Sequence, residues 1–66
     1  MKINTNKFYC LLALKELSLR DLSKLSSTSL ATLTKLCKGN SKVHFKTLGK
    51  ISKALNVNPQ ELIKED

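Results

Sequence analysis

The chain has 66 residues, a formal net charge of +7 and a hydrophobic content of 41%. These values are typical of one small globular domain, residues 1–66, and exclude a disordered tail. The sequence lacks an apolar run of about 18 residues, so we expect no membrane-spanning helix. It also lacks a signal-peptide core followed by a small-residue cleavage site, so we expect a cytoplasmic protein.

The charged residues are distributed unevenly along the chain. The acids are Glu16, Asp21, Glu61, Glu65 and Asp66. The segment between Leu22 and Gln60 holds no acid but seven lysines: Lys24, Lys35, Lys38, Lys42, Lys46, Lys50 and Lys53. One-sign charge of this kind favours a polyanionic partner, with double-stranded DNA ahead of a membrane surface. The alternative is a surface that serves only solubility.

Residues that carry catalysis or bind metals are few and scattered. Cys10 and Cys37 are the only cysteines, and a single pair is a weak signal for a disulfide. His44 stands alone, without a metal-ligand spacing. The sequence contains neither a nucleophile with a base at motif spacing nor a glycine-rich phosphate loop. We therefore expect no enzyme, no metal, no cofactor and no small-molecule ligand.

The first helix is expected from about Asn6 to Leu17, because Phe8, Leu11 and Leu12 follow a helical spacing. A second helix should begin after Ser18, which forms a capping-box pattern with Asp21. Its inner face should carry the two leucines that lie three positions apart, Leu22 and Leu25. The run Ser26-Ser27-Thr28 should end this helix, since such side chains compete with the backbone for hydrogen bonds.

The third helix should be short, with Ser29 as its cap and Gly39 as its left-handed stop. Leu33 and Leu36 are expected to face inward, whereas Leu30, Ala31, Thr34, Lys35 and Lys38 point elsewhere. Two helices joined by so short a turn must cross steeply, which is the geometry of a helix-turn-helix.

A loop over residues 40–43 should lead to a fourth helix, which begins near His44 or Phe45 and ends at Leu55. Its expected inner face is Phe45, Leu48, Ile51, Ala54 and Leu55. Gly49 costs helix stability, so we expect it to mark close packing against a neighbouring helix.

The fifth helix is indicated by Asn58 as cap, Pro59 at the first helical position and Glu61 closing a capping box. Val57 and Leu62 are placed to form a hydrophobic staple across that cap. Since no segment alternates as a strand does, the sequence predicts an all-α fold of five helices.

From about Phe8 to Ile63 the chain resembles the Cro/lambda-repressor-type (XRE-type) helix-turn-helix family. The resemblance rests on Leu22-Ser23, Ser29, Leu33, Leu36, Gly39 and the run TLGKISKALNVNPQEL at residues 47–62. It implies a lambda-repressor-like domain whose third helix lies in the major groove of DNA. Family pattern assigns base contacts to Leu30, Ala31, Thr32, Thr34 and Lys35, and backbone contacts to Ser18, Arg20, Ser29, Lys38, Asn40 and Lys42.

The chain departs from the family pattern at several positions. Leu19 stands where Gln is common, so Arg20 is expected to take over its phosphate contact, and Ser27 replaces the usual turn Gly. The positions of a frequent Arg–Glu pair hold Leu12 and Cys37, which predicts an apolar contact instead.

The expected reading surface also departs from the family pattern. Leu30 and Ala31 lack the amides that read adenine, so specificity would rest on few direct contacts, thymine methyls or DNA shape. Alternative interpretations remain for single residues. In these alternatives, the Lys35 side chain is only solvated and the Thr34 hydroxyl bonds back to its own helix. Likewise, Leu30 would pack on a neighbouring element and His44 would contact a phosphate.

These patterns predict a sequence-specific transcriptional regulator, a repressor, that binds two-fold DNA sites as a homodimer. Dimer contacts would come from Leu62 and Ile63 or from the first helix. The alternative is a protein-binding adaptor, such as an antitoxin or antirepressor, that uses Leu19 or Leu30 and binds DNA weakly. A cationic membrane-active peptide conflicts with the defined helix caps.

Overall fold

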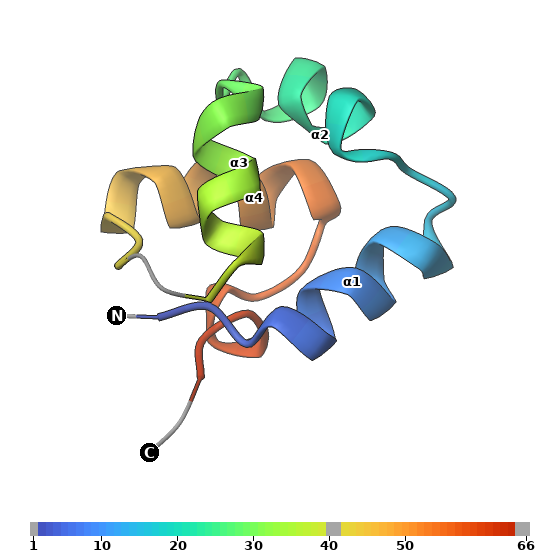
Figure 1. Ribbon diagram of the computed structural model, residues 1–66. Helices are drawn as coiled ribbons and strands as arrows, with labels where there is room; N and C mark the ends of the chain where they lie inside the picture. Colours follow the sequence, from blue (N-terminus) through green and yellow to red (C-terminus); the bar gives the residue numbers. More distant parts are fainter. Residues whose placement is uncertain (1, 40–41, 65–66) are drawn as a thin grey trace.

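The computed structural model describes residues 2–39 and 42–64. Four α-helices follow one another along the chain: α1 (Thr5–Leu14), α2 (Leu19–Ser26), α3 (Leu30–Cys37) and α4 (Phe45–Leu55). A single 3-10 turn, η1 (Pro59–Glu61), comes last. In Figure 1, α3 stands upright in front of α4, with α2 toward the upper right and α1 at the lower right. The all-helical prediction is confirmed, but the expected fifth helix is only this 3-10 turn.

Side-chain caps fix where the helices begin. Asn4 Oδ1 accepts a hydrogen bond from the backbone N–H of Lys7 at 3.2 Å, so α1 starts at Thr5, one residue earlier than expected. Helix α1 ends at Leu14 rather than Leu17, because Glu16 adopts a left-handed backbone with φ of 54°. The caps predicted at Ser18, Ser29 and Asn58 are all present.

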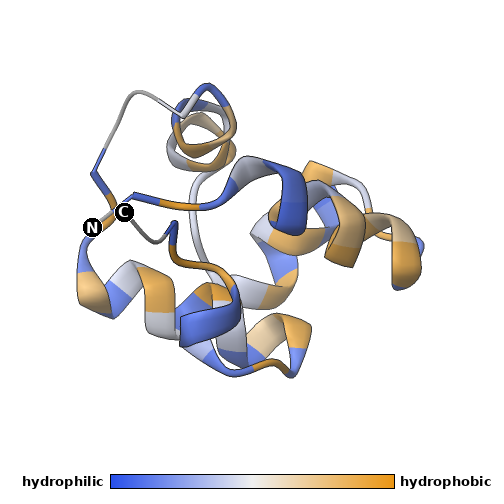
Figure 2. Ribbon diagram, turned by 90° about the horizontal axis from the view of Figure 1, so that it is seen from below, coloured by the Kyte–Doolittle hydropathy of each residue, from blue (hydrophilic) through white to orange (hydrophobic). Residues whose placement is uncertain are grey.

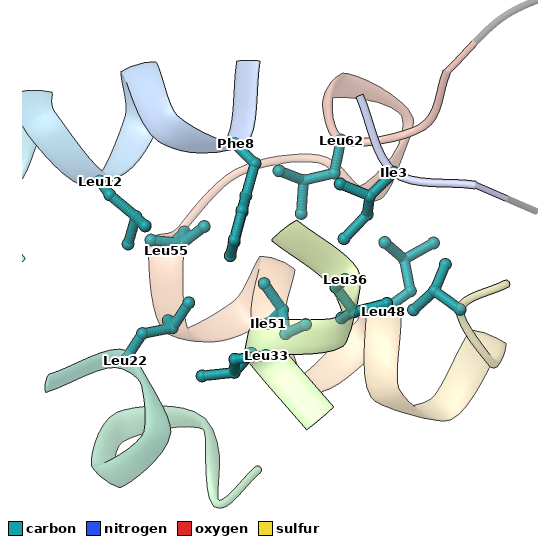
Figure 3. Close-up of a cluster of buried hydrophobic side chains, with 11 residues drawn as sticks. Ile3, Phe8, Leu12, Leu22, Leu33, Leu36, Leu48, Ile51, Leu55 and Leu62 are labelled. Carbon is teal, nitrogen blue, oxygen red and sulfur yellow. The ribbon is translucent and has the colours of Figure 1, made fainter. Parts of the chain in front are cut away.

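The core is built from side chains of every helix and of both chain ends (Figure 3). The predicted inward residues Leu22, Leu33 and Leu36 are buried, as are Leu48, Ile51 and Leu55 of α4. Among the described residues, the buried apolar side chains are Ile3, Phe8, Leu12, Leu22, Leu33, Leu36, Val43, Leu48, Ile51, Leu55 and Leu62.

The two ends of the described chain pair with each other and close this core. The backbone N–H of Asn4 donates to the carbonyl of Leu62 at 2.7 Å, and that of Lys64 donates to the carbonyl of Lys2 at 2.8 Å. An isolated antiparallel bridge joins Ile3 and Ile63. Leu62 is 0% exposed. The prediction that Leu62 makes dimer contacts is therefore wrong, because its side chain is fully buried in the core of its own chain.

The expected inner faces of α2 and α4 are each wrong at one residue. On α2, Leu22 shares the buried face with Ser26, one turn later, and Leu25 is 59% exposed. On α4, Phe45 is 79% exposed, because Val43 enters the core just before the helix begins.

Ser52 and Gly49 also differ from expectation on α4. Ser52 is buried, and its hydroxyl donates to the carbonyl of Gly49 at 3.1 Å. A Cβ at Gly49 would meet no atom of a neighbouring element within 4 Å. The expected close packing at Gly49 is therefore wrong.

In the part of the chain that the structure describes, every helix falls short of the length and hydropathy needed to cross a bilayer.

Ser27 connects α2 to the turn in a left-handed conformation, with φ of 54°. A side chain in this region is strained by about 1–2 kcal/mol, whereas Gly is not, although Gly also loses more backbone entropy on folding. We therefore expect Ser27→Gly to raise the free energy of unfolding by about 0.5–1 kcal/mol, measured by urea unfolding. Ala31→Gly, inside α3, is the matched control and should lower it by about 1 kcal/mol. A loss in both variants would contradict the strain.

Candidate nucleic-acid interface

Helix α3 has one buried and one exposed face. Leu33 and Leu36 enter the core, while Ala31, Thr34 and Lys35 are exposed and Leu30 is 38% exposed. Thr32 is half-buried at the edge between the two faces. The structure thus brings the five predicted base-contacting residues onto one short helix that offers its outer side to solvent.

The hydroxyl groups of this helix are partly committed to its own backbone. Ser29 Oγ accepts from the backbone N–H of Thr32 at 3.2 Å and lies 2.8 Å from Thr32 Oγ1. Thr34 Oγ1 donates to the carbonyl of Leu30 at 2.8 Å. The alternative interpretation of Thr34 therefore describes the structure. Its hydroxyl proton is used, but its oxygen still has acceptor capacity and its residue is exposed.

Helix α2 precedes the connection that leads into α3, and it begins at Leu19, directly after its cap Ser18. Ser18 and Asp21 form a reciprocal capping box, with N–H to oxygen distances of 2.9 and 3.1 Å. Hydrogen bonds from the backbone and side chain of Ser18 hold the pKa of the Asp21 carboxyl below its ordinary value of 3.8. Leu19 packs against the core and Arg20 is exposed. The position of Arg20 is therefore compatible with the phosphate contact expected of it.

Polar side chains brace the turn between α2 and α3. Ser23 Oγ donates to the carbonyl of Thr28, and Ser26 Oγ donates to the carbonyl of Leu22 at 2.6 Å. Buried Thr28 donates to the carbonyl of Ser26 at 3.3 Å. Within residues 2–39 and 42–64, every buried side-chain nitrogen and oxygen has a hydrogen-bond partner. The hydroxyl-rich turn, in which Ser27 stands where Gly is usual, therefore leaves no buried side-chain group unsatisfied among the described residues.

A second exposed cluster lies where the chain enters α4. Lys42, His44, Phe45 and Lys46 are all exposed, and Asn40 falls outside the described residues. Sequence reasoning missed the exposure of Phe45. The signal that could have revealed it is Val43, an apolar residue placed to fill the same end of the core before the helix starts.

The cysteines of the chain are free thiols, one exposed at Cys10 and one half-buried at Cys37. Cys37 packs against the apolar core cluster to which Leu12 belongs. A side-chain hydrogen bond with Cys37 raises the pKa of Tyr9 above 10.0. Among the described residues, histidines, cysteines and acids gather nowhere in groups of three that could hold a metal ion.

Comparison with known families places this helix-turn-helix arrangement. The family model described as the Cro/C1-type HTH DNA-binding domain matches residues 10–65. The chain belongs to the Cro/C1-type helix-turn-helix family, as its resemblance indicated. Membership supports a regulator that binds double-stranded DNA. Searches of curated proteins and of solved structures returned no match to this chain.

Proposed function

We infer that this chain is a sequence-specific transcriptional repressor that places α3 in the major groove of DNA. The observation that carries this proposal is the outer side of α3, which is exposed and has polar and cationic segments on either side in the chain. The segment from Leu22 to Gln60 adds no carboxylate that would repel phosphate.

Base reading is assigned to the residues on the exposed side of α3. Lys35 donates to the O6 and N7 acceptors of guanine, and the methyl of Ala31 contacts the methyl of thymine. Thr34 accepts from a base amino group, since its proton is given to Leu30. Leu30 and Thr32 contribute apolar contact, because Thr32 Oγ1 is engaged by Ser29.

Phosphate contacts are assigned to polar groups at the ends of the helices. Arg20 and Ser18 act at the start of α2, and Ser29 acts at the start of α3. Lys38, Asn40 and Lys42 follow the end of α3. Contacts of this type hold the protein in register on the duplex and carry little sequence information. Specificity therefore depends on the few side chains of α3 and on DNA shape.

A homodimer on a two-fold operator provides the remaining specificity. Two copies would read half-sites about 34–36 Å apart, one helical turn of DNA. Bound across a promoter, such a dimer would block polymerase. Selection of bound sequences from a random DNA pool tests this arrangement, since recovered palindromes at that spacing support it and unrelated sequences contradict it.

Salt dependence separates DNA binding from the adaptor alternative. Neutralising phosphate with Arg20, Lys38 and Lys42 should make log Kd rise with log salt at a slope of about 3 per protein chain on random duplex. Fluorescence anisotropy at several salt concentrations measures it. Lys64→Ala, at the far end of the chain, is the control and should leave the slope unchanged. A flat salt response would favour a protein-binding adaptor instead.

A further inference from the structure

The second half of α1 is apolar at every position. Residues 10–14 read Cys-Leu-Leu-Ala-Leu, so this part of the helix is hydrophobic on all sides, as its colouring in Figure 2 shows. A helix of this kind is normally covered all round. Here Leu12 alone is buried and Leu11 is half-buried, whereas Cys10 and Ala13 are exposed and Leu14 is 77% exposed.

The exposed apolar residues form a stripe rather than scattered positions. Cys10, Leu11 and Leu14 lie three and four residues apart, so they share one face of the helix, with Lys7 one turn before them. An open hollow of about 220 Å³ lies at the start of this stripe, lined by Lys7, Cys10, Leu11 and Glu61. We call Cys10, Leu11 and Leu14 the α1 stripe.

The charges around the α1 stripe indicate what covers it. One cation, Lys7, and one anion, Glu61, line the same hollow, and a second pair of opposite charges, Lys15 and Glu16, follows the end of the helix. Most of the chain beyond α2 is purely basic, so two copies that each carry +7 repel one another over that part of the surface. The mixed charges beside the α1 stripe make it the apolar surface on which two like-charged copies meet with least repulsion.

Besides Leu14, the strongly exposed large apolar residues among the described positions include Leu25 and Phe45, and the surroundings of Phe45 differ from those of the α1 stripe. Its chain neighbours Lys42, His44 and Lys46 are basic or neutral, without an acid among them. A symmetric contact there would bring like charges together, which opposes self-association. Of the other expected dimer contacts, Leu62 is fully buried and Ile63 is half-buried against the core.

We propose that the α1 stripe is a self-association surface, covered by the same stripe of a second copy about a two-fold axis. The helices run antiparallel, so that Lys7 at the start of the α1 stripe in each copy lies toward Glu16, after the end of α1, in the other. Helix α1 lies in the lower part of the molecule and α3 begins at the top (Figure 1), so this pairing leaves the start of α3 uncovered. The proposal deepens the homodimer of the proposed function by naming its interface.

Sedimentation equilibrium of the full chain tests the surface. Wild type should show a concentration-dependent monomer–dimer equilibrium, and Leu14→Glu should raise the dimer dissociation constant at least tenfold. Leu25→Glu is the matched control, since it charges an exposed leucine on α2, and it should dimerise as wild type does. Circular dichroism should show that both variants remain helical. Wild type that stays monomeric, or a Leu14→Glu variant that still dimerises, would overturn the proposal, as would dimer loss in Phe45→Glu alone.

Thiol cross-linking gives an independent readout of the same contact. With Cys37→Ala, the remaining Cys10 thiols of two copies should be joined by a short bis-maleimide, one thiolate adding to each ring. Adding Leu14→Glu to this variant should suppress the cross-linked dimer. Absence of the cross-linked dimer from the Cys37→Ala protein that keeps Leu14 would overturn the proposal. Binding to a duplex with one half-site distinguishes a failure of the α1 interface from a failure of DNA binding itself. Leu14→Glu should keep wild-type affinity there, and lose only cooperative binding to two half-sites.

Discussion

Leu22→Ala is expected to lower the free energy of unfolding by about 2–5 kcal/mol, whereas Leu25→Ala should change it by less than about 0.5 kcal/mol. The two leucines lie three residues apart on α2, and the sequence pattern treats them alike. In the structure, Leu22 is fully buried and Leu25 is mostly exposed. Truncation at Leu22 opens a cavity among Leu33, Ile51 and Leu55, its companions in the core (Figure 3), but truncation at Leu25 only trims the surface.

The consequence for function follows from the size of the chain. A domain of 66 residues has a total stability of only about 3–10 kcal/mol. Leu22→Ala should therefore leave a measurable fraction unfolded without denaturant, and weaken apparent DNA binding in proportion. Urea unfolding followed by circular dichroism measures both variants. Similar losses at the two positions would mean that the inner face of α2 is the one predicted from the sequence.

The helix starts could be predicted because their causes are local. Ser18 with Asp21 and Asn58 with Glu61 each place donor and acceptor within three residues, and both boxes are present. The same local origin explains why the sequence predicted a full helix near the C-terminus, where the structure has only the 3-10 turn η1. The box starts a helical turn, but the backbone at Leu62 and Lys64 pairs with the N-terminal segment, and η1 ends after three residues.

What could not be predicted depends on contacts between distant segments. Helical spacing shows that Leu25 and Phe45 are near an apolar face, but not where a neighbouring helix stops covering it. Ile3 is buried because the chain ends meet, which neither end shows by itself. For the site, the family resemblance located the exposed side of α3, whereas the sequence left two roles open for the Thr34 hydroxyl and the structure shows it donating to the carbonyl of Leu30.

The clearest test of the reading surface compares two lysines at the end of α3. Lys35 lies on the exposed side of the helix, and Lys38 follows its last residue. If Lys35 donates to guanine, Lys35→Ala should narrow the free-energy gap between operator and random duplex by about 1–3 kcal/mol. If Lys38 binds phosphate, Lys38→Ala should weaken both duplexes equally and reduce the salt slope by about one unit.

Both variants remove one positive charge from neighbouring turns, so each controls for the loss of charge in the other. Competition titrations with operator and random duplexes, repeated at several salt concentrations, give the gap and the slope for each variant. Thr34→Val adds a third comparison, because it removes a hydroxyl whose proton is already bonded to Leu30 and keeps a methyl at the same place. A gap unchanged in Lys35→Ala but narrowed in Thr34→Val would move base reading from the lysine to the threonine. Equal changes in all three would leave specificity to DNA shape.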